Sequence, residues 1–138
     1  MMTFFSFFNS FNHPRRIFII DSIGALFTFA TTFFLAVQFS HYIGLPNQHL
    51  KSLSFLALGF SVYSFCCYRF VQTIKSWHLQ LIACLNSVYI LFSFILISIY
   101  FSAVSPFFLG YFGLETIVIL FLVRVELKLS QKVKIHAS

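Results

Sequence analysis

The chain has 138 residues, of which 59% are hydrophobic and only 9% are charged. Soluble domains carry about 25% charged residues, so a soluble fold is excluded because so few charges could not cover its surface. The length allows one domain. A formal net charge of +6 could indicate nucleic acid in a soluble protein, but here the basic residues stand at the ends of apolar runs, which is a topology signal. We therefore expect no nucleic-acid partner.

Residues 1–16 are expected to form a cytoplasmic or interfacial N-terminal segment. Phe4, Phe7, Phe8 and Phe11 recur there at helical spacing. The spacing fits either a short helix on the membrane surface or a frayed apolar tail. Asp21 interrupts the next apolar stretch early, and no small-residue cleavage site follows. This pattern favours an uncleaved first span over a signal peptide.

Four apolar runs predict four transmembrane helices. They cover residues 17–39, 52–71, 78–100 and 107–125, and each is close to the roughly 20 residues that a span needs. Residues 76–114 contain no Asp, Glu, Lys or Arg, and this stretch is too long for one helix. Ser102, Ser105 and Pro106 divide it into the third run and the start of the fourth. Pro106 also suits the first turn of a new helix.

The runs are continuously apolar, whereas the strands of a membrane barrel alternate apolar and polar residues. We therefore expect an all-α membrane protein, built as a four-transmembrane-helix up-down bundle over residues 17–126. A basic cytoplasmic tail is expected at residues 127–138.

The distribution of Lys and Arg predicts the orientation of this bundle. With the N-terminus inside, the cytoplasmic side would hold eight basic residues, which are Arg15, Arg16, Arg69, Lys75, Arg124, Lys128, Lys132 and Lys134. The other side would hold only Lys51. This bias predicts that both termini are cytoplasmic and that the number of spans is even.

Small and polar residues recur at helical spacing within the spans, which is typical of helix–helix seams in membranes. The first two spans carry Asp21, Gly24, Ala25, Thr28, Thr32, Ser54, Ala57, Ser61 and Ser64. Gly110 and Gly113 in the fourth span also indicate close packing.

The three acidic residues of the chain are the most informative polar positions. A charge at the centre of a membrane helix costs roughly 2.5–3.5 kcal/mol on insertion scales. Glu115 lies near the middle of the fourth span, and Asp21 about one turn into the first. Glu126 stands among basic residues where the fourth span ends, and is expected to be an ordinary interfacial acid.

At 1.5 Å per helical residue, Tyr63, Asn86, Tyr89 and Glu115 fall at a similar depth near mid-membrane. Together with Asp21 they form the candidate intramembrane polar site, with Asn86 and Tyr89 as partners of Glu115. Glu115 fits a proton or cation site and fits equally a structural carboxyl. For Asp21 a structural role is favoured, as a helix-start acid or as the ion-pair partner of Arg69 or Arg124.

Three cysteines form a second, weaker candidate site. Cys66, Cys67 and Cys84 are expected at one depth, where thiols could bind a soft metal. The favoured interpretation is that they act as small hydrophobic residues. No catalytic, cofactor-binding or metal motif is present: there is no H-x-x-x-H, no phosphate-binding glycine loop and no C-x-x-C. No cofactor is expected.

Several short motifs together resemble a group of small uncharacterised four-span membrane proteins of Bacteroidota. The residues that carry the resemblance are Asp21 with Gly24–Ala25, Gly44-Leu45-Pro46, Cys67–Tyr68 followed by Trp77, Asn86 with Tyr89, and Gly110-Tyr111-Phe112 followed by Glu115. The resemblance covers the chain from Asp21 to Glu126. It implies a bacterial inner-membrane location and no particular activity.

Three functions remain open, and the sequence ranks them without deciding between them. The first is a small transporter or channel-like subunit with Glu115 as its mid-membrane acid. The second is a structural or helper subunit of a membrane complex. The third is a membrane enzyme acting on lipid or quinone. The expected partners are the lipid bilayer and either further copies of the chain or other membrane-protein subunits.

Overall fold

The computed structural model describes residues 13–137, and these residues form an all-α bundle. The long helices are α2 (Pro14–Gln38), α4 (Asn47–Phe70), α5 (Ser76–Ile99) and α6 (Pro106–Ala137), with the short α3 (Ser40–Ile43) after α2. All four long helices are long and apolar enough to cross a membrane. The prediction of a small four-span membrane protein is confirmed at this level. The Phe-rich part of the predicted N-terminal segment lies outside the described residues.

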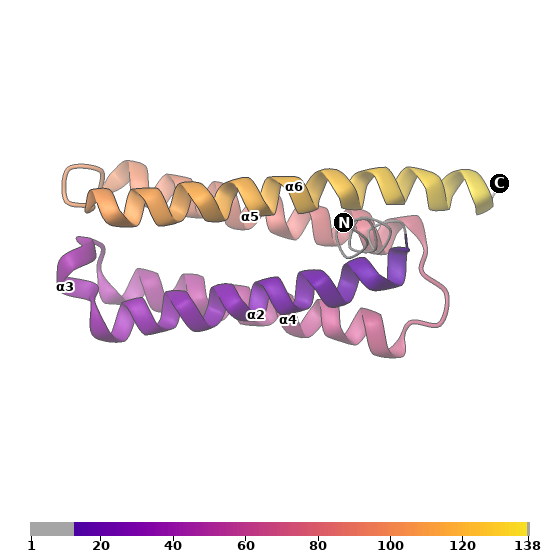
Figure 1. Cartoon of the computed structure of the whole chain (residues 1–138), viewed down its shortest axis with the longest axis horizontal. Coiled ribbons are helices and arrows are strands. Elements are labelled where there is room, and N and C mark those ends of the chain that lie inside the picture. Colours follow the sequence, from indigo (N-terminus) through magenta and orange to yellow (C-terminus); the bar gives the residue numbers. More distant parts are fainter. Residues whose placement is uncertain (1–12, 138) are drawn as a thin grey trace, which may run out of the picture.

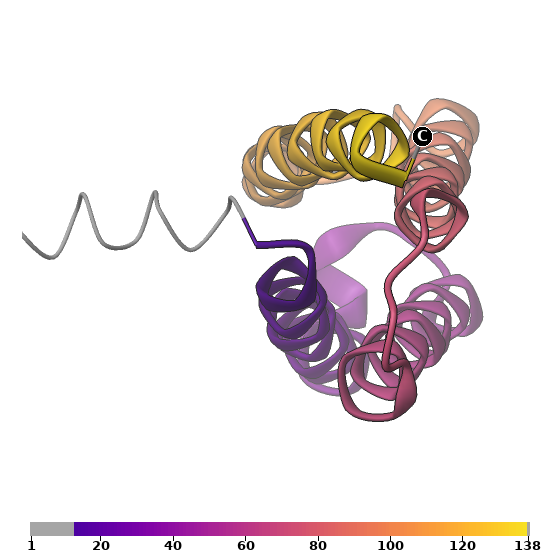
Figure 2. The ribbon, with the colours of Figure 1, turned by 90° about the vertical axis from the view of Figure 1, so that its right-hand side faces the viewer.

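The bundle consists of two helix pairs. α2 packs along α4, and α5 packs along α6, with the two pairs stacked as layers (Figure 1). Seen along its axis, the bundle places α2 and α6 on one side and α4 and α5 on the other (Figure 2). The start of α2 and the end of α6 lie at one end, which we call the terminal end, and α3 with the α5–α6 turn lies at the opposite end, the loop end.

The α2–α4 pair is held by small residues that let the two backbones approach closely. Ser22 Oγ donates to the carbonyl oxygen of Ser61 at 3.0 Å, and Ser61 Oγ donates to that of Ser22 at 2.8 Å. Six of the predicted small and polar seam residues are buried in the bundle. They are Asp21, Thr32, Ser54, Ala57, Ser61 and Ser64. The prediction that Gly110 and Gly113 mark close packing between helices was wrong. A Cβ atom added at either would meet no atom within 4 Å.

Helix boundaries differ most from the predicted ones at the terminal end. α2 begins at Pro14, because proline is favoured in the first helical turn. α6 continues past residue 125 to Ala137 and therefore includes most of the predicted basic tail. No glycine or proline interrupts this segment, and Leu129, only 3% exposed, packs into the core cluster with Ile17 and Phe18.

At the loop end, the backbone at Gly44, just after α3, passes close to the turn between α5 and α6. Gly44 has φ 83°, in the left-handed region that favours glycine. A Cβ atom here would collide with the carbonyl oxygen of Ala103. The neighbouring Ile43 carbonyl accepts a hydrogen bond from the Ser105 amide at 2.9 Å. The close approach of the two chain segments therefore depends on a residue without a side chain.

Candidate functional site

The most extensively bonded polar group in the bundle centres on Asp21. Ser64 Oγ on α4 donates to Asp21 Oδ2 at 2.6 Å, and Asn86 Nδ2 on α5 donates to Asp21 Oδ1 at 2.9 Å. The same nitrogen lies 3.3 Å from Oε1 and 3.5 Å from Oε2 of Glu126 on α6. We call these four residues the carboxyl cluster. Each of the four long helices contributes one of its members.

All four members of the carboxyl cluster are buried. Asp21 is 2% exposed, Glu126 0%, Ser64 0% and Asn86 6%. The two carboxyl groups also lie within hydrogen-bonding reach of each other. Such a bond needs a proton on one of them, because two carboxylates have only acceptors. The geometry therefore describes two acids that share one amide donor.

Two expectations about this region were wrong. Glu126 is buried inside the bundle and is not an interfacial acid. The reason is that α6 does not end at residue 125, and Glu126 lies on the same inward face of this helix as Leu122 and Leu129. Asp21 does not pair with Arg69 or Arg124. Both arginines are exposed, and the partners of Asp21 within residues 13–137 are the members of the carboxyl cluster.

Glu115 lies in a separate and more weakly bonded group. Tyr89 Oη donates to Glu115 Oε1 at 3.4 Å, and the Thr28 side chain is a further hydrogen-bond partner. Nearby, the Tyr111 and Thr31 hydroxyls lie 2.8 Å apart. The structure thus places Glu115 with Tyr89, as the sequence predicts, but Asn86 bonds Asp21 and Glu126 instead.

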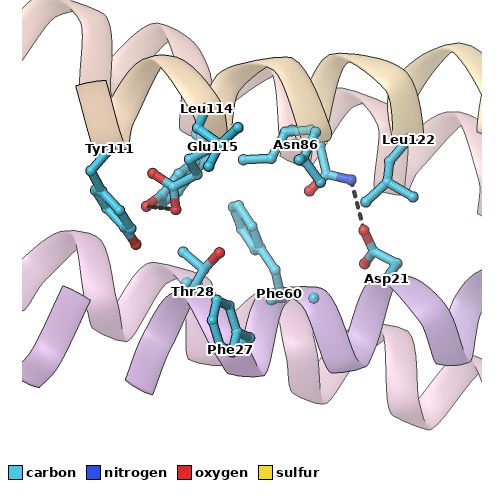
Figure 3. Close-up of a pocket in the computed structure, with 15 residues that line it drawn as sticks. Asp21, Phe27, Thr28, Phe60, Asn86, Tyr111, Leu114, Glu115 and Leu122 are labelled. Carbon is cyan, nitrogen blue, oxygen red and sulfur yellow. Dashed lines mark hydrogen bonds between the residues drawn. The ribbon is translucent and has the colours of Figure 1, made fainter. Parts of the chain in front are cut away.

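A cavity of about 230 Å³ lies between the carboxyl groups of Asp21 and Glu115, and both residues line it. Asp21 and Asn86 lie at one side of it and Glu115 at the other, with Phe60 between them (Figure 3). The cavity lies between α2 and α6, two neighbouring helices that contact each other much less than the members of each pair do. It is lined by Asp21, Gly24, Ala25, Phe27, Thr28, Ala57, Phe60, Asn86, Tyr89, Tyr111, Leu114, Glu115, Val118, Ile119 and Leu122.

The remaining candidate residues lie elsewhere. Tyr63 packs against the core cluster at the terminal end, and its hydroxyl lies beside the Cys67 thiol. Cys66 and Cys84 are exposed, whereas Cys67 is buried. The three thiols therefore do not converge. Among residues 13–137, no three His, Cys, Asp or Glu side chains are placed to hold a metal ion.

Sequence reasoning missed the role of Glu126, and one signal could have found it. Glu126 follows Leu122 by four residues and precedes Leu129 by three, which places it on the same helical face as both. This signal becomes visible only if the helix is extended beyond residue 125.

Comparison of the chain with known protein families, with characterised proteins and with solved structures finds no match.

Proposed function

We propose that the chain is a small transporter or channel-like subunit in which Glu115 is the coupling or selectivity group. The observation that carries this proposal is the position of the Glu115 carboxyl in the wall of the cavity between α2 and α6. A charge held in the interior of a bilayer is costly, so its retention in a membrane helix is typical of ion and proton pathways.

The carboxyl cluster supports the same function. It lies at the side of the cavity nearer the terminal end, and Asp21 belongs to both. A proton shared by Asp21 and Glu126 could pass to or from an occupant of the cavity without crossing apolar side chains. Glu115 and the carboxyl cluster would then be two proton-holding positions, one at each side of the cavity.

Proton flux into vesicles tests this function. Purified protein would be reconstituted in vesicles that contain a pH-sensitive dye, and a pH gradient would be applied. We expect a flux that Glu115→Gln reduces at least about tenfold, because the neutral amide cannot exchange a proton. The variant should keep the thermal stability of the parent. A parent protein without flux, or a Glu115→Gln variant with unchanged flux, would count against transport.

We further propose that the protein lies in a bacterial inner membrane with both termini in the cytoplasm. The eight basic residues near the terminal end of the bundle support this orientation. Single cysteines introduced at Thr73 and Gln48, at opposite ends, would test it in a background without Cys66, Cys67 and Cys84. A membrane-impermeant thiol reagent applied to intact cells should label Gln48→Cys and not Thr73→Cys. The opposite pattern would reverse the orientation.

A helper subunit is the second candidate, and one observation favours it. Gly110 and Gly113 lie on an exposed face of α6 with no atom within 4 Å of an added Cβ. Small residues on an outer face let another membrane helix approach closely. Disulfide-independent chemical cross-linking in native membranes would detect such a neighbour, and Gly110→Leu with Gly113→Leu should abolish the cross-link. A cross-link that survives the double substitution would exclude this face.

A further inference from the structure

The wall of the cavity combines acidic and aromatic side chains. Asp21 and Glu115 contribute carboxyl groups, and four rings contribute aromatic surface, those of Phe27, Phe60, Tyr89 and Tyr111. Among the described residues that line the cavity there is no Lys, Arg or His. An anionic occupant would therefore meet no cationic partner, whereas a cation would meet both carboxyl groups and π-faces.

We infer that this cavity binds a small organic ammonium cation that carries an apolar substituent. Aromatic rings attract quaternary and tertiary ammonium groups through their negative faces, most strongly where water is excluded. A carboxylate at the same site adds charge complementarity. The inference rests on the cavity used in the proposed function and names the class of molecule that would occupy it.

Glu115 is the expected counter-ion. Both oxygens of Asp21 already accept short hydrogen bonds, at 2.6 Å from Ser64 and 2.9 Å from Asn86. The hydrogen bond from Tyr89 to Glu115 Oε1 is longer than either of these, at 3.4 Å. Glu115 can therefore turn toward a ligand at smaller cost than Asp21, whose bonds would have to break.

The volume limits the size of the occupant. An engineered apolar cavity of about 150 Å³ holds benzene. A cavity of about 230 Å³ has room for one aromatic ring and a trimethylammonium group, and not for a molecule with several rings. Benzyltrimethylammonium has the required size and charge.

The route of entry is sideways, between α2 and α6. Phe27 on α2 and Leu114 and Val118 on α6 line the cavity and are 68%, 66% and 53% exposed on the outside of the bundle. In a membrane this surface faces lipid chains. An ammonium compound whose apolar substituent partitions into the bilayer would reach the cavity from there.

Gly24 offers a way to fill the cavity without disturbing the helix contacts. It lines the cavity, and an added Cβ would meet no atom within 4 Å. Gly59 on α4 is equally free of neighbours and is not among the lining residues. Gly24→Leu and Gly59→Leu are therefore matched variants, of which only the first places a side chain in the proposed site.

Equilibrium binding to the purified full chain in lipid nanodiscs would test the inference, with saturation-transfer NMR as the readout. Three probes of similar size would be compared: benzyltrimethylammonium, its neutral carbon analogue neopentylbenzene, and the phenylacetate anion. We expect the cation to bind at least about tenfold more tightly than the neutral analogue. Glu115→Gln should remove this difference. Gly24→Leu should abolish binding of the cation, and Gly59→Leu should preserve it.

Equal binding of the three probes would overturn the inference, as would binding that survives Gly24→Leu. Loss of binding in Gly59→Leu would also overturn it, because the effect would then not belong to the cavity. The Gly24 and Gly59 pair keeps the test decisive if Glu115→Gln fails to fold. No gradient is applied, so a protein that binds the cation but shows no proton flux would contradict the transport proposal alone.

Discussion

Asp21 on α2 and Glu126 on α6, near opposite ends of the described chain, accept hydrogen bonds from the same Asn86 nitrogen. This shared donor joins the two helix pairs of the bundle, because α2 belongs to one pair, and α5 and α6 form the other. The weakly packed side between α2 and α6 is thus bridged by polar contacts on one side of the cavity. On the Glu115 side of the cavity, the Thr31 hydroxyl on α2 and the Tyr111 hydroxyl on α6 form a second polar contact at 2.8 Å.

The first prediction concerns this bridge. Asn86→Leu keeps the branched shape of the side chain and removes the donor to both acids. Hydrogen bonds between membrane helices average only about 0.6 kcal/mol, but a donor that serves two buried carboxyl groups should contribute about 1–3 kcal/mol. We expect unfolding in mixed micelles to show a loss in that range.

Ser87→Ala is the matched control for that change. Ser87 Oγ donates to the Ala83 carbonyl of its own helix at 2.8 Å, and within residues 13–137 this bond does not involve another helix. Its loss should change the free energy of unfolding by less than about 0.5 kcal/mol. An Asn86→Leu variant as stable as Ser87→Ala would show that the amide does not hold the bundle.

The second prediction is that the two acids of the carboxyl cluster are coupled. A double-mutant cycle of Asp21→Asn and Glu126→Gln should give a coupling energy of about 0.5–3 kcal/mol, because both side chains share one donor. The cycle would be measured by reversible unfolding in mixed micelles. Asp21→Asn with Glu115→Gln is the comparison pair, since these acids line one cavity but have different hydrogen-bond partners among the described residues. If both cycles are additive, the shared amide has no energetic role.

The third prediction compares two glycines. Gly44→Ala should destabilise the protein by more than about 1 kcal/mol, because alanine disfavours the left-handed conformation and its Cβ would collide with the Ala103 carbonyl oxygen. Gly59→Ala should instead stabilise it by roughly 0.5–1 kcal/mol, because Gly59 lies inside a helix and has free space around it. Thermal unfolding of the two variants should thus shift in opposite directions. Equal shifts would contradict the close approach at the loop end.

The fourth prediction tests the extension of α6. Leu129→Ala should cost about 2–5 kcal/mol, since Leu129 is 3% exposed within the core cluster at the terminal end. Leu127 is 45% exposed on the same helix, and Leu127→Ala should cost much less. The free energy of unfolding would again be the measurement. Similar small losses for both variants would indicate that the segment after residue 125 does not pack on the bundle.

The sequence by itself determined the class of the protein and its four long helices. Apolar runs of about 20 residues leave their backbone groups no partners in a bilayer except within a helix, and Pro106 marks where one run becomes two. The pairing of Glu115 with Tyr89 also followed from depth along the helices, because both residues were expected at one level.

Only the tertiary structure decided which acid meets which partner. Depth along a helix is set by residue number, but the direction of a side chain also depends on how each helix is rotated and where it ends. Glu126 points inward because α6 continues to Ala137 and packs Leu129 into the core. Asn86 turns to Asp21 and Glu126 rather than to Glu115, and the cavity exists because α2 and α6 pack on other helices. Hydropathy alone predicts neither the burial of Glu126, nor the partners of Asn86, nor the cavity.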